Sequence, residues 1–296
     1  MKALHALCAA ALALCATAAG AAGTLDKVRD SGKLTIGFMD SRPFSYTEGG
    51  KAGGFAIALC EKLADAIKAQ LNLPALAVDW QAVKPDEAFK AVDQGRIDLL
   101  CGAVPSLERR ALVDFSIPIA LTGTGAAVRS DAPPRLVQAL SGLIRPDWPV
   151  WRGSADQAPQ RVRLAVVEGI PLEEALASTL RQRRIVADIV TVKSPDAGLQ
   201  LLASRGADAF LNDRSFLVDA VARDKQQAGI QVLDRIFRRD VVALAVRRND
   251  ADFRLLVDRS LSQLYRSSDM VALYTKYFGP PPAMTQDFFN LVALPD

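Results

Sequence analysis

Hydrophobic and polar positions alternate between strand-like and helix-like patterns from residue 25 onward. Apolar residues recur at helical spacing in some segments, whereas in others they alternate with polar residues or form short runs. The predicted strands are 34–38, 76–82 and 97–101, and the predicted helices are 57–71 and 86–92. Asp86 is the expected N-cap of the second helix, and Gly95 is expected to stop it. This alternation predicts an α/β sheet with helices on both faces.

The same alternation restarts near residue 162. Here the predicted strands are 162–167, 185–192 and 207–211, and the predicted helices are 171–184 and 195–206. The segments Gln-Gly-Arg-Ile-Asp-Leu-Leu (94–100) and Arg-Gly-Ala-Asp-Ala-Phe-Leu (205–211) echo each other, each with a glycine and an aspartate before a buried strand. Two lobes built on one plan would produce this echo, although such pairs also arise by chance in α/β proteins.

Between the two halves, residues 130–161 contain five prolines and two of the three tryptophans, Trp148 and Trp151. We interpret this insertion as a surface loop whose tryptophans fold back onto the lobe. The alternative is an exposed aromatic patch for a partner protein.

Composition narrows the function classes. Half of the 296 residues are hydrophobic and 23% are charged, which excludes disorder. The 36 basic residues nearly balance the 33 acidic ones, so a dedicated nucleic-acid binder is not expected. The single histidine, His5, lies in a segment that we expect to be removed. A protein without histidine has no Ser-His-Asp or Cys-His catalysis and no imidazole metal site, and we expect no cofactor.

Residues 1–21 have the features of an export signal. Lys2 provides the positive charge, residues 4–19 form a short apolar run, and Ala-Gly-Ala at 19–21 fits a small-residue cleavage site. The run is too short for a membrane anchor, and no other stretch is long and apolar enough to span a bilayer. The mature protein is therefore expected to be soluble and exported to the periplasm.

Export makes the cysteine count informative. Two of the four cysteines leave with the signal, and Cys60 and Cys101 remain. In an oxidising compartment two cysteines favour one disulfide. The alternative is a pair of buried free thiols that pack as small apolar groups.

Four motifs follow one another along the first half of the chain. The first is Ser-Gly-Lys-Leu-Thr-Ile-Gly-Phe-Met-Asp-Ser-Arg-Pro-Phe-Ser-Tyr (31–46), and the second is Gly-Gly-Phe-Ala-Ile-Ala-Leu-Cys (53–60). Gly-Arg-Ile-Asp-Leu-Leu-Cys-Gly-Ala (95–103) and Ser-Leu-Glu-Arg-Arg-Ala-Leu-Val-Asp-Phe-Ser (106–116) follow. In their order and spacing these motifs resemble family 3 of the bacterial extracellular solute-binding proteins, and within it the glutamate/aspartate-binding branch. The resemblance covers nearly the whole mature chain.

The resemblance implies a two-lobed, periplasmic-binding-protein-like (type II) α/β fold, with two hinge strands and a ligand cleft between the lobes. Lobe one would comprise residues 24–121 and 241–296, and lobe two residues 122–240. The hinges would lie near 120–122 and 240–242. By the same resemblance the protein would capture an amino acid or a related small acid for an ABC importer. Its expected partners are this ligand and a membrane permease, and it is expected to act as a monomer.

Two residues match the family's clamp for an amino acid. Arg109 lies at the position of the arginine that binds the ligand carboxylate, and a guanidinium meets a carboxylate in a bidentate manner. Asp213 matches the aspartate that binds the ammonium. The alternatives are a surface salt bridge of Arg109 with Glu108 or Asp114, and a helix cap at Asp213.

Other positions would line the cleft by the same resemblance. Ser106 replaces a threonine, or merely begins a turn, and Phe44 is either an aromatic near the ligand or a core residue. Arg42 would reach an acidic ligand side chain, or remain a solvated loop residue. The remaining expected contacts are Gly102, Val104, Gly169 and Ile170.

Departures from the family pattern affect the specificity more than the clamp. Val104 replaces a common hydroxyl, and Gly169-Ile170-Pro171 replaces Gly-Thr-Thr at a helix start in lobe two, where proline also removes an amide donor. Met39 lies where the acidic-amino-acid branch often has an arginine. Glutamate or aspartate is therefore not assumed as the ligand.

Two other functions would suit the same fold. One is an enzyme such as a cyclohexadienyl dehydratase, for which Glu168 and Glu173 are the candidate acids, although helix-start glutamates are usually structural. The other is an orphan protein that docks a periplasmic partner, for example through Trp148 and Trp151. We expect a binding protein and not an enzyme.

Overall fold

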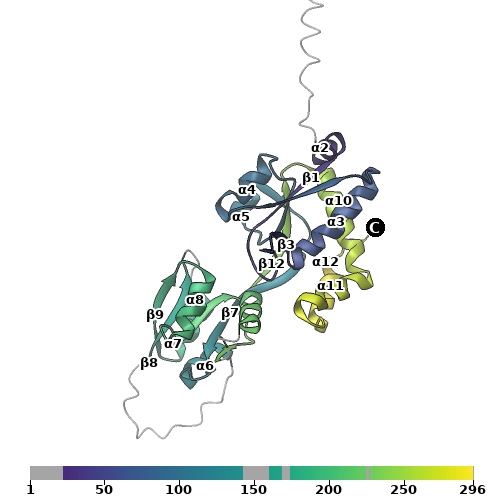
Figure 1. The fold of residues 1–296 in the computed structure, drawn as a ribbon. Helices are drawn as coiled ribbons and strands as arrows, with labels where there is room; N and C mark the ends of the chain where they lie inside the picture. The colour runs from purple at the N-terminus through teal and green to yellow at the C-terminus, as the bar shows by residue number, and fades with distance from the viewer. Residues whose placement is uncertain (1–22, 143–159, 169–173, 225–226, 228, 296) are drawn as a thin grey trace, which may run out of the picture.

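The computed structural model describes residues 23–142, 160–168, 174–224, 227 and 229–295. Figure 1 shows two α/β lobes joined by two long strands, β7 (Ala120–Arg129) and β12 (Arg238–Arg247). This architecture confirms the predicted two-lobed fold. The expected export signal, Trp148 and Trp151 lie outside the described residues.

Lobe one is built on a sheet with the strand order β4-β1-β5-β12, and β6 also pairs with β12. Its strands are β1 (Lys33–Phe38), β4 (Ala77–Ala82), β5 (Leu99–Ala103) and β6 (Val113–Phe115). Strand β1 is parallel to both β4 and β5, whereas β12 runs antiparallel to β5. A small hairpin of β2 (Tyr46–Glu48) and β3 (Lys51–Gly53) follows β1. The apolar runs of the sequence thus become the central strands of this sheet.

Helices cover both faces of this sheet. One face is covered by α2 (Thr24–Ser31), α3 (Phe55–Leu71), α10 (Ala251–Tyr265), α11 (Ser268–Phe278) and α12 (Ala283–Val292). Phe55 and Phe253 are fully buried on that face. On the other face lies α4 (Pro85–Asp93), and α5 (Leu107–Arg110) follows β5. The prediction that Asp86 caps α4 was wrong. Lys84 holds the N-cap position and Asp86 lies in the first turn, because Pro85 at N1 starts the helix earlier.

Lobe two repeats the plan with the strand order β7-β10-β8-β9, and β11 (Ile230–Val232) also pairs with β7. Its other strands are β8 (Gln160–Val167), β9 (Ile185–Val192) and β10 (Ala209–Asp213). Helices α6 (Pro134–Ser141) and α7 (Glu174–Gln182) cover one face, and α8 (Pro195–Ala203) and α9 (Arg214–Arg223) the other. The strand predicted at 207–211 lies at Ala209–Asp213 in the structure, so Asp213 ends β10 directly before α9.

The two connecting strands pair with each other where the chain passes between the lobes. Ala120, Leu121 and Thr122 of β7 lie opposite Val242, Val241 and Asp240 of β12 in an antiparallel ladder. These are the positions at which the resemblance implied hinges. Because the two strands are hydrogen-bonded side by side, a bend in one strand must be shared by the other.

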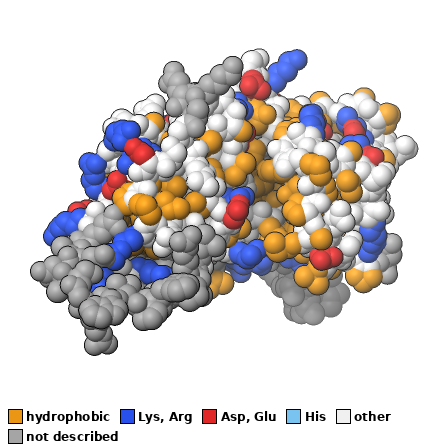
Figure 2. Space-filling model, turned by 90° about the horizontal axis from the view of Figure 1, so that it is seen from below, with side chains coloured by type: hydrophobic (Ala, Val, Ile, Leu, Met, Phe, Trp, Pro, Cys, Tyr) orange, Lys and Arg blue, Asp and Glu red, His pale blue; other side chains and the backbone are white. Residues whose placement is uncertain are grey.

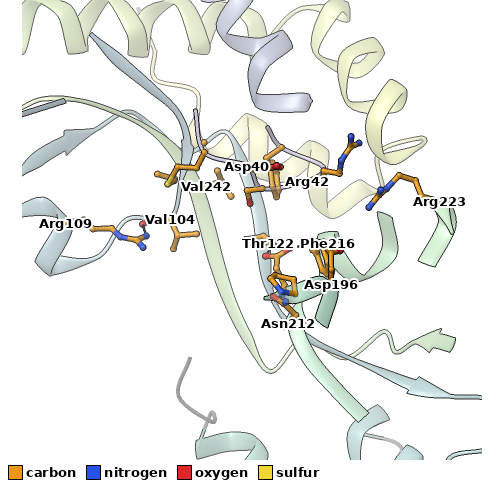
Figure 3. A pocket seen from close by; sticks show the side chains of 17 residues that line it. Asp40, Arg42, Val104, Arg109, Thr122, Asp196, Asn212, Phe216, Arg223 and Val242 are labelled. Carbon is orange, nitrogen blue, oxygen red and sulfur yellow. Dashed lines mark hydrogen bonds between the residues drawn. The ribbon is translucent and has the colours of Figure 1, made fainter. Parts of the chain in front are cut away.

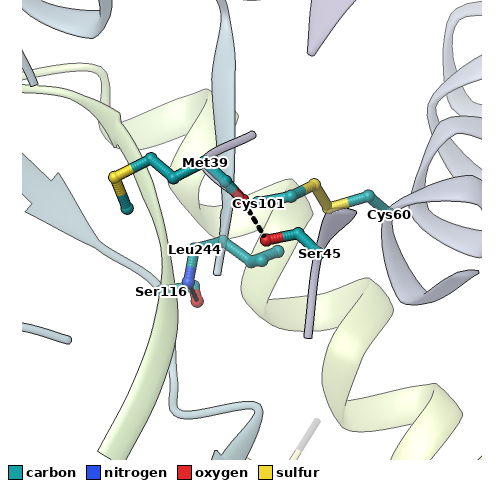
Figure 4. The surroundings of a disulfide bond; sticks show 6 residues. All are labelled: Met39, Ser45, Cys60, Cys101, Ser116 and Leu244. Carbon is teal, nitrogen blue, oxygen red and sulfur yellow. Dashed lines mark hydrogen bonds between the residues drawn. A yellow bond between two sulfur atoms is a disulfide. The ribbon is translucent and has the colours of Figure 1, made fainter. Parts of the chain in front are cut away.

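A disulfide joins Cys60 of α3 to Cys101 of β5, which confirms the predicted bond (Figure 4). Both residues are fully buried, and their Cα atoms are 6.6 Å apart. Nearby, the Ser45 hydroxyl donates to the Met39 carbonyl oxygen at 2.7 Å and fixes the loop that follows β1. The bond therefore ties α3 to β5, the strand that also carries Gly102.

The surface has no single charged field on the face seen in Figure 2, where basic side chains form separate groups with acidic ones between them. Among the helices of the described residues, none is long and apolar enough to cross a membrane.

Candidate ligand-binding site

A cavity of about 580 Å³ lies between the two lobes and takes its walls from both (Figure 3). Lobe one contributes the loops that follow β1 and β5, and lobe two contributes the start of α8, the end of β10 and helix α9. The connecting strands contribute Thr122 and Val242. Ligands of open α/β sheets bind outside the carboxyl ends of the strands, and this volume is typical of small-molecule sites.

Arg109 lines the cavity from lobe one, where the short helix α5 holds it. One guanidinium nitrogen, Nη1, donates to the Val104 carbonyl oxygen at 2.5 Å, and the guanidinium carbon lies 4.8 Å from the centre of the Phe89 ring. Burial lowers the pKa of this guanidinium, and the neighbouring Glu108 opposes the shift. These contacts leave other N–H donors of the group for an anion in the cavity.

Asp213 lines the same cavity from lobe two and also caps α9. Its Oδ1 accepts from the backbone amides of Ser215 and Phe216 at 2.9 and 3.2 Å, and its Oδ2 accepts from the Thr122 hydroxyl. Burial raises the pKa of this carboxyl, although the hydrogen bonds from Thr122 and from the backbone of Phe216, Ser215 and Gly123 oppose the shift. A half-buried carboxylate held in this way gains from a cation in the cavity.

Of four further lobe-one residues expected at the ligand, three line the cavity and one caps a helix. Gly102 and Val104 line the cavity, and Gly102 has a φ of +80°, a conformation that glycine adopts without strain. Phe44 lines the cavity and is also buried in the core against Phe55 and Phe278. Ser106 caps α5 by accepting from the Arg109 amide at 3.1 Å and does not line the cavity.

Arg42 lines the cavity from the loop that follows β1. Its guanidinium carbon lies 3.6 Å from the centre of the Tyr46 ring, and its Nη2 is 3.5 Å from a Glu48 carboxylate oxygen. The side chain is half-buried, with 22% exposed, so it is not a freely solvated loop arginine. Gly169 and Ile170 lie outside the described residues.

Sequence reasoning missed the cavity residues that lobe two supplies besides Asp213. These are Pro195, Asp196, Asn212, Phe216 and Arg223. Asn212 is buried, its Oδ1 accepts from the Asp213 amide at 2.7 Å, and its Nδ2 has no hydrogen-bond partner among the described residues. The available signal was that each of the predicted parallel strands ends at the same sheet edge, so the residues just after 192 and 211 must face the cleft.

Of the two candidate acids of an enzyme, Glu168 and Glu173, the structure describes only Glu168. Glu168 does not line the cavity, and its exposed carboxylate is 3.3 Å from the Lys193 ammonium. Glu173 lies outside the described residues. Within the described part of the chain, no group of His, Cys, Asp and Glu side chains is arranged to hold a metal ion.

Comparison with known proteins decides the family. The model of the bacterial extracellular solute-binding proteins, family 3, matches residues 34–280. The chain belongs to this family. This family 3 protein is 29% identical over 263 residues to an L-glutamate/L-aspartate-binding protein of Pseudomonas aeruginosa, an alignment that covers 88% of this chain and 81% of that one.

Two further likenesses agree with the assignment. A glutamate/aspartate import solute-binding protein of Salmonella typhimurium is 26% identical over 277 residues, covering 92% of this chain and 85% of that one. Among solved structures, the ancestral amino-acid-binding protein described as a precursor of cyclohexadienyl dehydratase is 25% identical with a TM-score of 0.63, covering 87% of this chain and all of that one. The two curated relatives confirm the predicted glutamate/aspartate-binding branch.

Proposed function

We propose that this family 3 protein captures an amino acid in the periplasm and delivers it to the permease of an ABC importer. One observation carries the proposal: Arg109 and Asp213, of opposite charge and from opposite lobes, line one cavity. An amino acid entering a cleft loses the hydration of both its charged groups and needs a partner of opposite sign for each. The carboxylate would meet Arg109 and the ammonium would meet Asp213.

The two-lobed fold allows a permease to distinguish the ligand-bound protein from the ligand-free one. A ligand that contacts both lobes favours the closed arrangement over the open one, because it gains both sets of contacts only when the lobes meet. A permease then recognises the closed form. The amino-acid specificities carried in the names of the relatives support a ligand of this class.

Calorimetry tests the clamp. Purified protein is titrated with each of the common L-amino acids and with small dicarboxylates, and the ligand that binds is then titrated into Arg109→Ala and Asp213→Asn. We expect each variant to lose about ten- to a hundred-fold in affinity, because a charged ligand group loses its partner in a desolvated site. Two matched controls, Arg110→Ala and Asp234→Asn, alter residues of the same types that do not line the cavity and should bind as the wild type does.

The proposal fails if no amino acid or dicarboxylate binds, or if both clamp variants bind the ligand as tightly as the controls. The location and assembly state are tested separately. The mature N-terminus should lie at residue 22 in protein from a periplasmic fraction, and size-exclusion chromatography should find a monomer.

A further inference from the structure

The strands of lobe two begin at the end of the lobe that is far from the cavity. Strand β7 leaves the ladder with β12 and ends inside lobe two at Arg129. Strand β10 runs antiparallel to β7, and β8 and β9 run parallel to β10, so these three strands begin near Arg129 and end toward the cavity. Figure 1 shows β9 on the outer side of lobe two, away from lobe one.

Arginines gather at this far end, in the segments that join one element of lobe two to the next. Those in the described residues are Arg129, Arg135, Arg161, Arg163, Arg181, Arg183, Arg184 and Arg205. The described aspartates of the same segments are Asp131, Asp188, Asp208 and Asp224. We call this set the arginine edge. Its eight arginines and four aspartates leave an excess of positive charge, in a chain whose formal net charge is only +3.

The strand register places several of these residues side by side. Arg163 of β8 lies opposite Asp188 of β9, and Arg161 lies opposite Val186. The Arg163 Nη2 donates to the Arg205 carbonyl oxygen at 2.7 Å, which brings the loop before β10 next to the start of β8. The arginine edge is therefore one continuous surface.

The aspartates of the edge pair with some of the arginines. Arg129 and Arg205 share the Asp131 carboxylate. Arg161 has a nitrogen 3.4 Å from an Asp188 carboxylate oxygen. Because these pairs are exposed at the surface, the aspartates only partly neutralise the arginines beside them.

Four arginines of the edge are exposed to solvent and differ in their partners. The Arg161 and Arg205 side chains are 75% and 71% exposed, and Arg163 and Arg184 are exposed as well. Among the ion pairs of the described residues, none involves Arg163 or Arg184. A guanidinium binds a phosphate group in a bidentate manner, so exposed arginines of this kind suit phosphate better than lysines would.

The outermost strand adds apolar side chains to the arginine edge. Within the described part of the sheet, β9 pairs with β8 alone, and its other side has no neighbouring strand. Val186 and Ile189 of this strand are 40% and 44% exposed. At the surface of an anionic bilayer, apolar side chains enter the headgroup region while basic ones meet lipid phosphates. A free phosphate ion or a nucleic acid would use only the arginines.

We propose that the arginine edge of lobe two binds the surface of a membrane that contains anionic phospholipid. The arginines contact the headgroup phosphates, and Val186 and Ile189 enter the headgroup region beside them. Such binding is reversible and sensitive to salt, because it depends on exposed charges. The edge lies at the opposite end of lobe two from the cavity, so the proposal does not depend on which ligand the cavity holds.

Sedimentation with lipid vesicles tests the proposal. The mature protein is mixed with vesicles of phosphatidylcholine alone, or of phosphatidylcholine and phosphatidylglycerol in equal amounts, at low salt and at about 0.3 M salt. At low salt we expect about ten-fold or stronger binding to the anionic vesicles than to the neutral ones. High salt should remove most of this difference, because it shortens the range of the electrostatic attraction.

Two matched variants locate the binding surface. Arg161→Gln/Arg184→Gln should weaken binding to the anionic vesicles about ten-fold or more, because each basic residue near such a surface contributes about five-fold. Arg96→Gln/Arg248→Gln removes the same charge from exposed positions of lobe one and should bind as the wild type does. Thermal melts check that both variants are folded, and Arg161→Gln alone replaces the double variant if that one does not fold.

A third variant separates a membrane from other polyanions. Val186→Ser/Ile189→Ser keeps every charge and should weaken binding to the anionic vesicles about five-fold or more, because less apolar area enters the headgroup region. Its binding to a short duplex DNA at the same salt should equal that of the wild type, which relies on charge alone.

Three results would overturn the proposal. The first is equal binding to neutral and anionic vesicles, or to neither. The second is an equal loss of binding in the two arginine variants, which would mean that the overall charge attracts the protein and not the arginine edge. The third is wild-type vesicle binding by Val186→Ser/Ile189→Ser, which would make the edge a general polyanion surface. The amino-acid titrations of the cavity are separate, so the proposed function stands in each case.

Discussion

The disulfide between Cys60 and Cys101 gives the sharpest prediction about stability. It closes a loop between residues 41 positions apart in the sequence. In the chain-entropy model such a cross-link lowers the entropy of the unfolded chain by about 13 cal/mol/K, which corresponds to about 4 kcal/mol at room temperature. We therefore expect Cys60→Ala/Cys101→Ala to lose up to that much free energy of unfolding.

At roughly 2–4 °C per kcal/mol for domains of 150–250 residues, this loss lowers the melting temperature by roughly 8–16 °C. The assay is a thermal melt followed by circular dichroism, with wild type and variant purified without reductant. A matched melt in a strong thiol reductant is the control: the wild type should move toward the variant, and the variant should not move. A double variant that melts within about 2 °C of the wild type would refute the argument that the cross-link restricts the unfolded chain.

Three further predictions concern the site, the core and the hinge. Ligand affinity should fall as the pH is lowered through the raised pKa of Asp213, because the carboxyl is neutral below its pKa and no longer holds an ammonium. In titrations from neutral pH to about pH 4, binding should be lost at a higher pH than an ordinary aspartate would give, whereas Asp213→Asn should bind weakly throughout. Phe55→Ala should lower the free energy of unfolding, measured by urea denaturation, by about 3–5 kcal/mol, because Phe55 is fully buried. Leu291→Ala, at an exposed position, should lower it by less than about 0.5 kcal/mol, and equal effects would contradict the burial argument. Gly123→Ala should lower the melting temperature, because a Cβ there collides with the Arg238 carbonyl oxygen of the paired strand. The control is Gly229→Ala, where the added Cβ meets open space, and equal melting temperatures of the two variants would exclude the clash.

The fold was predictable from local patterns for a physical reason. Central strands such as 97–101 are buried on both faces and therefore form apolar runs, and amphipathic helices such as 57–71 carry their apolar spacing in the sequence. The residues at which helices and strands begin and end were harder to predict from the sequence. Asp86 suits an N-cap by type, but the fixed φ of Pro85 starts α4 one residue before it, at a cap position held by Lys84.

Within the candidate site, motifs located the residues close in sequence to a recognisable segment, as for Arg109, Gly102 and Val104. Arg223 carries no such signal, because it faces the cavity only through the direction of α9, ten positions after Asp213. The Thr122 hydroxyl reaches Asp213 across 91 positions, a contact made by the pairing of β7 with β10. Contacts of this kind follow from the assembled topology and not from local spacing.

The pairing of β7 with β12 also has a consequence for how such a protein can be inherited. The chain leaves for lobe two and returns from it on two adjacent, hydrogen-bonded strands, with Arg238 opposite Thr124. Lobe two is thus inserted into lobe one at a single place. A recombination event with one breakpoint in β7 and the other in β12 would exchange the whole of lobe two. Such a chimera would combine the cavity wall that carries Arg109 in one ancestor with the wall that carries Asp213 in another, so that new ligand preferences can arise by exchange of lobes as well as by point substitution.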